Sequence, residues 1–177
     1  MLVALSQLIS SSCSKYLYPE YSFPAIESQA ERNKLKVFMD AGVEKEISTN
    51  NLSTDEIIET ARQYLGVPYC MGGTTTKCMD CSGMLHTVFA SYGILLPHNS
   101  EEQARYGKIL STKVELKRGD LVFFIQSYKS HQLITHSGIY LGNDEFIHTS
   151  TKKGVSITSI NDPWWSDKFI FGTRIFK

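Results

Sequence analysis

The spacing of apolar and polar positions predicts a helix near the start of the chain. Ser28-Gln29-Ala30-Glu31 forms a capping box, in which a serine hydroxyl and a glutamate satisfy the first backbone N–H groups of a helix. Leu35, Phe38 and Met39 follow at helical spacing, and Gly42 ends the segment. We therefore predict a helix over residues 29–41. The polar residues 43–51 form a predicted linker.

Three more helices are expected before the predicted strands. A second capping box opens at Ser53, and its helix ends at Gly66 with an apolar inner side of Ile57, Ile58, Ala61 and Leu65. Residues 82–92 follow the same period on the face formed by Met84, Leu85, Val88, Phe89 and Tyr92. A third capping box, which starts at Ser100, predicts a short helix that ends near Gly107.

The second half of the chain changes to a pattern typical of strands. Residues 121–125 are continuously apolar, which predicts a central strand buried on both faces. β-Branched and aromatic residues bounded by turn residues predict further strands. These strands cover residues 135–141, 145–149, 155–159 and 170–176. Gly142-Asn143-Asp144 predicts a hairpin turn, and the polar loop 126–133 carries His131, which we expect to be a solvated loop residue.

These strands complete a predicted antiparallel sheet. The chain has 177 residues, 42% of them apolar and 20% charged, with a formal net charge of zero. This composition is that of an ordinary globular protein and gives no basic excess for binding nucleic acid. We expect a signal-like segment and tether over 1–27, a helix and linker over 28–52, and one main domain over 53–177.

The first residues resemble an export signal only in part. Met1 to Ser12 are apolar and small, but the basic residues that usually precede such a stretch are missing. Cys13 follows small residues, as a lipidated cysteine does, although Ser10 stands where leucine is preferred. We expect export and a membrane tether through lipid on Cys13. An idle cysteine in a frayed terminus is the alternative.

One cysteine stands where its thiol can be activated. Cys81 comes at the predicted start of a helix, where unpaired N–H groups and the helix dipole favour a thiolate. His136 and His148 lie in two predicted strands joined by a short turn, so antiparallel pairing can bring them together. A thiol, a histidine and a third polar group form a nucleophile, a base and an orienting residue. The alternative for Cys81 is a small buried residue.

Six motifs in this order resemble the NlpC/P60 family of cysteine peptidases. They are Gly-Val-Pro-Tyr (66–69), Gly-Gly (72–73), Asp-Cys-Ser-Gly (80–83), Gly-Asp-Leu-Val-Phe-Phe (119–124), His-Ser-Gly-Ile-Tyr-Leu-Gly (136–142) and Phe-Ile-His (146–148). The resemblance covers residues 52–177. Residues 154–165 look closest to the branch of murein endopeptidases that are lipoproteins.

The resemblance implies a papain-like α+β core that cleaves peptidoglycan stem peptides without a metal or cofactor. It implies Cys81 as nucleophile, His136 as base and His148 as the residue that orients it. Tyr69 matches the tyrosine beside the nucleophile, and we expect it to stabilise an oxyanion together with the backbone N–H of Cys81. Asp80 caps the helix or contacts the stem peptide, and Ser82 flanks the nucleophile on its other side. We expect an exported monomer, either in the periplasm, as an outer-membrane lipoprotein, or secreted.

Three other functions remain open at this stage. Cys78-Met79-Asp80-Cys81 is a Cys-x-x-Cys motif of the kind used in thiol–disulfide redox chemistry. Cys70, Cys78 and Cys81 with a histidine would form a zinc site, although their spacing is unusual for one. A cysteine amidase or acyltransferase on a substrate other than peptidoglycan uses the same nucleophile. Cys70 departs from the family pattern, and a disulfide between Cys70 and Cys78 is possible after export.

Overall fold

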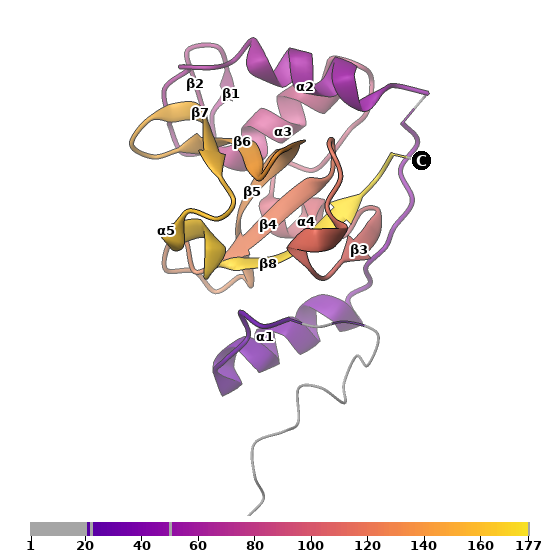
Figure 1. The fold of residues 1–177 in the computed structure, drawn as a ribbon, viewed down its shortest axis with the longest axis vertical. Coiled ribbons are helices and arrows are strands. Elements are labelled where there is room, and N and C mark those ends of the chain that lie inside the picture. Colours follow the sequence, from indigo (N-terminus) through magenta and orange to yellow (C-terminus); the bar gives the residue numbers. More distant parts are fainter. Residues whose placement is uncertain (1–20, 22, 50, 177) are drawn as a thin grey trace, which may run out of the picture.

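A six-stranded antiparallel sheet forms the centre of the molecule (Figure 1). The computed structural model describes residues 21, 23–49 and 51–176. Its strands are β3 (Lys108–Leu110), β4 (Leu121–Ile125), β5 (Ile134–Gly142), β6 (Glu145–Ser150), β7 (Gly154–Ser159) and β8 (Phe169–Arg174). They lie in the order β3-β8-β4-β5-β6-β7. Strands that follow one another along the chain therefore pair from β4 to β7, while the last strand, β8, lies between β3 and β4.

The helices lie around this sheet. They are α1 (Gln29–Asp40), α2 (Thr54–Arg62), α3 (Cys81–Ala90), α4 (Ser100–Gln103) and α5 (Pro163–Ser166). A 3-10 turn covers Lys113–Glu115, and a small ribbon pairs β1 (Thr74–Thr75) with β2 (Cys78–Met79). In Figure 1, α1 lies at the end of the molecule opposite α2. Among the described residues no helix has the length and apolar character needed to cross a membrane.

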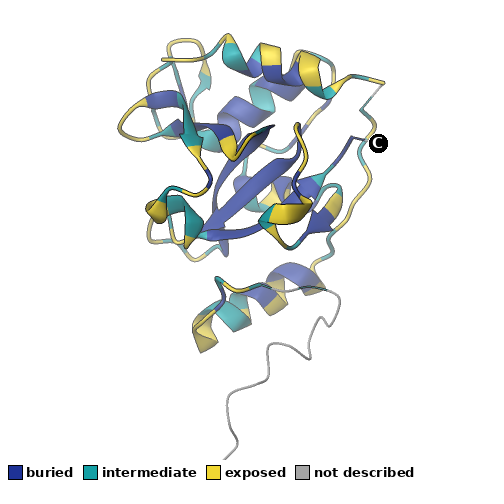
Figure 2. Cartoon of the chain, viewed as in Figure 1, coloured by how far each residue is buried: buried dark blue, intermediate teal, exposed yellow. Residues whose placement is uncertain are grey.

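The sheet separates two apolar clusters, because alternate residues of a strand point to opposite faces. Phe123 belongs to the larger cluster with α1, α2 and α3, while Phe124 belongs to the smaller cluster with Trp165 of α5. Every residue of β4 is buried, which confirms the predicted two-sided central strand (Figure 2). The α+β class and the predicted strands at residues 135–141, 145–149, 155–159 and 170–176 are likewise confirmed, with ends shifted by one or two residues.

The hairpin between β5 and β6 sets the positions of the two histidines. Asn143 and Asp144 both have positive φ, 52° and 60°, as a two-residue hairpin turn requires. The register places Ile139 opposite Ile147, which brings Gly138 level with His148. A Cβ on Gly138 would lie 3.2 Å from the Cβ of His148 and 2.7 Å from the carbonyl oxygen of Ile147. Glycine is therefore required where the two strands approach each other here.

Helix α1 is attached firmly to the body. Phe38 is almost fully buried, with its ring 5.9 Å from that of Phe171 on β8. The buried Arg105 guanidinium lies 4.5 Å from the Phe38 ring centroid and donates to the carbonyl oxygens of Phe38 and Gly42. The capping box at Ser28 is present as predicted. This extension is thus a packed part of the fold.

Two local predictions are wrong. Leu65 was expected on the inner side of the second helix, but α2 ends at Arg62 and the turns that follow leave Leu65 exposed. Ser100 was expected to cap the short helix, whereas Asn99 is the cap and accepts the backbone N–H of Glu102. The Ser100 hydroxyl instead makes tertiary contacts.

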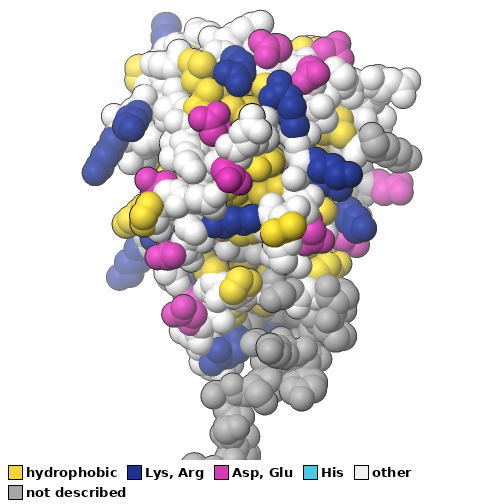
Figure 3. Space-filling view, viewed as in Figure 1, with side chains coloured by type: hydrophobic (Ala, Val, Ile, Leu, Met, Phe, Trp, Pro, Cys, Tyr) yellow, Lys and Arg dark blue, Asp and Glu magenta, His cyan; other side chains and the backbone are white. Residues whose placement is uncertain are grey.

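On the face drawn in Figure 3, cationic and anionic side chains are interspersed.

Candidate active site

The loop before α3 is held by both backbone and covalent contacts. Cys70 and Cys78 form a disulfide across it, with Cα atoms 5.4 Å apart. The Asp80 N–H donates to the Gly73 carbonyl at 3.1 Å, so the loop turns back against the start of the helix. Gly66 N–H also donates to the Val155 carbonyl at 2.9 Å, which joins the loop to β7. The residue before Cys81 is therefore fixed from several directions.

Asp80 caps α3, as predicted. Its Oδ1 accepts the backbone N–H of Gly83 at 2.6 Å and the hydroxyl of Ser82 at 3.0 Å. Its Oδ2 accepts the Gly72 N–H at 2.7 Å, which ties the loop to the helix start. A Cβ on Gly83 would lie 2.0 Å from the Gly73 carbonyl oxygen, so only glycine allows this close crossing. The cap and the loop together determine where Cys81 points.

The thiol of Cys81 is half-buried at the first residue of α3 and is the free thiol among the described cysteines. Its Sγ lies 3.5 Å from the hydroxyl oxygen of Ser100. Ser100 Oγ lies 3.0 Å from Ser137 Oγ, and Ser137 donates to Gln103 Oε1 at 3.2 Å. A chain of polar groups therefore runs from the thiol into the protein, with Gln103 fully buried at its end.

This chain has a direction. Gln103 Nε2 donates to the carbonyls of Ser82 and Pro97, at 2.8 and 2.7 Å, so its Oε1 can only accept. Ser137 therefore gives its proton to Gln103 and accepts that of Ser100. Ser100 is then left with a lone pair toward the sulfur, and the S–H of Cys81 donates to it. When the Ser100 hydroxyl rotates toward the sulfur, it donates to a thiolate instead and so lowers the pKa of Cys81.

Burial favours the protonated thiol. It raises the pKa of the Cys81 thiol above its usual value of 9, while the Ser100 hydroxyl lowers that pKa and the Asp80 carboxylate raises it. The expectation of a thiolate from position alone is therefore not met, since desolvation outweighs the stabilisation at the helix start. The backbone N–H of Ser137 also favours the thiolate, which places the sulfur beside the strand that carries His136.

The two histidines predicted to meet are in contact. His136 Nε2 lies 2.8 Å from His148 Nδ1, and His148 Nε2 lies 3.0 Å from the Thr158 hydroxyl on β7. Both rings are buried. The Trp165 ring lies 4.6 Å from His136 and 4.8 Å from His148, between centroids, and covers the pair. A direct bond from Cys81 to His136 is not among the hydrogen bonds recorded for the described residues, and such bonds are often long without substrate.

Burial also keeps the histidines neutral. It lowers the pKa of His136 well below its usual 6.5, and the neighbouring His148 lowers it further. The pKa of His148 falls to about 3, chiefly through burial and then through the charge of Lys153. The site at rest thus contains a neutral thiol and two neutral imidazoles, a combination in which a ring nitrogen can accept the thiol proton.

The other predicted site residues lie close by. Tyr69 is half-buried; burial raises its pKa, and Cys81 in its thiolate form and the Asp80 carboxylate raise it further. Ser82 is buried and bonded to Asp80, so its hydroxyl belongs to the cap. His131 is exposed on the β4–β5 loop, as predicted.

Several groups at the site were not predicted. They are Ser100, Gln103, Ser137, Thr158 and Trp165. The motif around residues 136–142 contained Ser137, but no local pattern indicated its tertiary partners. Trp165 was assigned only to the core or to a groove wall, and its cover over both rings depends on the chain folding back through α5.

The structure removes two of the alternative interpretations. Cys78 is bonded to Cys70, so it is not the partner of Cys81 in a Cys-x-x-Cys redox pair. Because Cys70 and Cys78 are bonded to each other, neither has a free thiolate that could bind zinc. The possible Cys70–Cys78 bond considered from the sequence is confirmed.

A thiol at the start of a helix, packed on an antiparallel sheet with a buried histidine pair, defines the papain-like class of cysteine hydrolases. Residues 66–174 match the NlpC/P60 family, and the chain belongs to that family. The matched region begins after α2, so α1 lies outside it. The family's members are cysteine peptidases.

Individual relatives agree with this assignment. The chain is 34% identical over 177 residues to murein DD-endopeptidase MepS/murein LD-carboxypeptidase of Escherichia coli K12, covering 99% of this chain and 88% of that protein. It is 33% identical over 131 residues to gamma-D-glutamyl-L-lysine dipeptidyl-peptidase of Bacillus cereus, covering 72% and 39%. The crystal structure of an NlpC/P60 family protein from Bacillus cereus matches with a TM-score of 0.65 at 31% identity, covering 71% and 41%. This chain spans less than half of the two Bacillus chains.

The raised pKa of Cys81 predicts how its alkylation depends on pH. Iodoacetamide labelling of Cys81, followed by peptide mass spectrometry, should increase with pH with a midpoint above 9. Ser100→Ala should move the midpoint further upward, because it removes a hydroxyl that lowers this pKa. Ser91→Ala, at the other end of α3, should leave it unchanged. A midpoint near neutral pH would show that the helix start outweighs burial.

The buried histidines predict a loss of stability in acid. Their folded pKa values lie below the unfolded value, so the unfolded chain binds more protons between about pH 6.5 and 3. The free energy of unfolding should fall over this window as pH falls, by up to about 1.4 kcal/mol per pH unit for each histidine. The free energy of unfolding, measured with urea at each pH, should depend less steeply on pH for His148→Gln than for wild type. The control His131→Gln should show the same pH dependence as wild type. Equal slopes for wild type and His148→Gln would contradict this account.

Proposed function

We propose that this protein is a cell-wall hydrolase, a cysteine endopeptidase that cleaves peptidoglycan stem peptides. The observation that carries the proposal is the half-buried Cys81 thiol at the start of α3, beside the strand of a buried His136–His148 pair. The likeness to murein endopeptidases supports peptidoglycan as the substrate. A cysteine amidase or acyltransferase would use the same groups, but no relative reported above favours it.

The histidine pair can supply a base in one protonation pattern. If His148 Nε2–H donates to Thr158, its Nδ1 accepts the Nε2–H of His136. The Nδ1 of His136 then carries a lone pair that can accept a proton. In this scheme Thr158 acts as the acceptor that selects the tautomer, and Trp165 holds both rings in place.

Catalysis follows as acyl transfer. Cys81 attacks the peptide carbonyl carbon while its proton moves to Nδ1 of His136. The backbone N–H of Cys81 and the Tyr69 hydroxyl stabilise the oxyanion. His136 returns the proton to the leaving amine as the C–N bond breaks, which leaves a thioester on Cys81. Water, deprotonated by His136, hydrolyses the thioester and releases the carboxylic acid and the thiol.

Two bonds are candidates for cleavage. The likeness to MepS over nearly the full chain favours the D-alanine–diaminopimelate cross-link between stems. The likeness to the Bacillus cereus dipeptidyl-peptidase favours the bond after γ-D-glutamate within one stem. We favour the cross-link, because the first alignment includes α1 and the second covers a smaller share of the chain.

Export to the cell envelope, with a lipid tether on Cys13, completes the proposal. Cys13 lies outside the described residues. The Cys70–Cys78 disulfide supports export, since such bonds persist in oxidising compartments. Recognition of the wall would then depend on the catalytic groove of a monomer held near the membrane.

Substitutions at the thiol and the histidines test the assigned roles. On purified sacculi, Cys81→Ala should reduce hydrolysis to background, and His136→Ala should reduce it by at least about 100-fold. His148→Ala should lose less activity than His136→Ala, because His148 acts through His136. Thr158→Val should lose less activity again, because Thr158 acts through His148. His131→Ala is the control and should be near wild type. A Cys81→Ala variant that still cleaves sacculi would contradict the assignment of the nucleophile.

The products identify the bond. Digested sacculi analysed by mass spectrometry should lose dimeric muropeptides while the stems of the monomers stay intact. Shortened stems would indicate cleavage after γ-D-glutamate. If no muropeptide changes with active wild-type protein, the peptidoglycan assignment is wrong.

Labelling tests the tether. Cells fed with radioactive palmitate should label the full-length protein and not Cys13→Ser, and the label should fractionate with membranes. Unlabelled protein in the cytosol would contradict both export and lipidation.

A further inference from the structure

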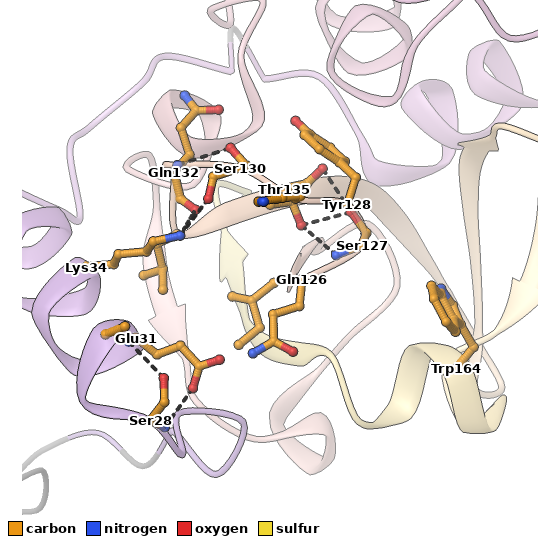
Figure 4. A pocket seen from close by; sticks show the side chains of 14 residues that line it. Ser28, Glu31, Lys34, Gln126, Ser127, Tyr128, Ser130, Gln132, Thr135 and Trp164 are labelled. Atoms are coloured by element: carbon orange, nitrogen blue, oxygen red, sulfur yellow. Dashed lines mark hydrogen bonds between the residues drawn. The ribbon is translucent and has the colours of Figure 1, made fainter.

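A cavity lies outside the contacts of Cys81 and His136. It has a volume of about 470 Å³ and lies between the start of α1, the loop from Gln126 to Leu133, and Trp164 of α5 (Figure 4). This size is in the range of ordinary ligand pockets. One wall comes from α1, which lies outside the part of the chain that matches the family.

The two tryptophans of α5 place this cavity beside the candidate active site. Trp164 lines it, and the adjacent Trp165 packs on the His136 ring at 4.6 Å. Tyr128 also lines it, from the loop between β4 and β5. Trp164 and Tyr128 are both more than half exposed, so they present aromatic surface at the cavity.

The position of the cavity relative to His136 indicates which part of a substrate it faces. His136 returns a proton to the leaving amine in the scheme above, so the leaving part of the substrate must lie on the His136 side of Cys81. The tryptophan pair lies on that side, with Trp165 against the ring and Trp164 in the cavity wall.

The lining suits a peptide that carries a carboxylate. Lys34 Nζ donates to the carbonyls of Ser130 and Gln132, at 2.7 and 3.2 Å, and an ammonium group has a third hydrogen to give. The exposed Lys129 adds a second positive charge. The carboxylate of Glu31 is engaged in the helix cap with the N–H of Ser28. That carboxylate keeps its negative charge and also lines the cavity, so Lys34 and Lys129 leave the lining with a net formal charge of +1.

Gln126 adds an amide suited to a peptide backbone. Its side chain lies in the space between α1 and Trp164 (Figure 4). Its φ of 53° is unusual for a residue other than glycine, Asn or Asp. Residues held in such conformations concentrate at binding sites, where the surrounding structure stabilises them.

We propose that this cavity is the subsite for the leaving stem peptide of a cross-linked muropeptide. The proposal rests on the peptidoglycan endopeptidase function proposed above. The leaving stem of a D-alanine–diaminopimelate cross-link has a free carboxylate on the same carbon as the released amine. Lys34 and Lys129 bind that carboxylate or the terminal one, Gln126 binds the backbone, and the exposed aromatic rings cover the apolar stem of diaminopimelate.

Filling the cavity tests this assignment. Ala30 is an exposed lining residue on α1, so Ala30→Trp should occupy the cavity without disturbing the core. Lys36→Trp places the same ring on α1 away from the cavity lining and serves as the control. With a purified tetrapeptide–tetrapeptide dimer, Ala30→Trp should raise KM about ten-fold with kcat within about two-fold, and Lys36→Trp should match wild type.

Further measurements separate a loss of substrate binding from a general effect of the large tryptophan side chain. Gln126→Ala, which adds no bulk, should raise KM in the same direction by a smaller factor. In the Cys81→Ala background, titration with the dimer should show the same loss of affinity for Ala30→Trp, and thermal melting should show that both variants are folded.

The outcomes separate this inference from the function on which it rests. Equal KM values for wild type, Ala30→Trp and Lys36→Trp on the dimer would overturn the subsite and leave the endopeptidase intact. Cleavage only within single stems, unaffected by Ala30→Trp, would do the same. A wild-type protein that neither binds nor cleaves any muropeptide would overturn both.

Discussion

The Asp80 carboxylate joins the loop before the thiol to the helix that begins with it. One oxygen accepts the Gly83 N–H and the other accepts the Gly72 N–H, at 2.6 and 2.7 Å. Because Cys81 follows Asp80 directly, these two bonds hold the backbone from which the sulfur projects. The Cys70–Cys78 disulfide and the close approach of Gly83 to the Gly73 carbonyl reduce that freedom further. The position of the thiol therefore depends on one set of contacts around Asp80, while its chemistry depends on groups that approach from the sheet.

Burial determines the charge state of those groups. It raises the pKa of Cys81 and lowers the pKa values of His136 and His148, so both proton carriers are neutral at rest. A buried neutral pair avoids the desolvation of two charges. The proton then has to move during the reaction, when the forming oxyanion and thioester change the local charge. The directional chain from Ser100 through Ser137 to Gln103 is consistent with this state, because its free lone pair faces an S–H.

The sequence predicted what depends on neighbours along the chain. The capping boxes at Ser28 and Ser53 are present because their partners lie three residues away. The hairpin that brings His136 to His148 was predicted for the same reason, through a turn of fixed residue types. The prediction that Ser100 caps the short helix was wrong, because the adjacent Asn99 is the cap. The Ser100 hydroxyl instead contacts the Cys81 sulfur. Thr158 and Trp165 reach the histidines only through the folding of β7 and α5, and no periodic pattern encodes such contacts.

The distribution of contacts also separates chemistry from substrate choice. The groups that position the thiol and the histidines all lie within residues 66–174, the part that matches the family. Lys34 of α1 lies outside it and holds the β4–β5 loop through Ser130 and Gln132. Arg105 in turn fixes α1 to the body through the carbonyls of Phe38 and Gly42. A change in α1 would therefore alter the loop and the cavity beside the active site without touching the Asp80 cap or the histidine pair. Such an arrangement allows the region beyond the scissile bond to vary while the reacting groups stay in place.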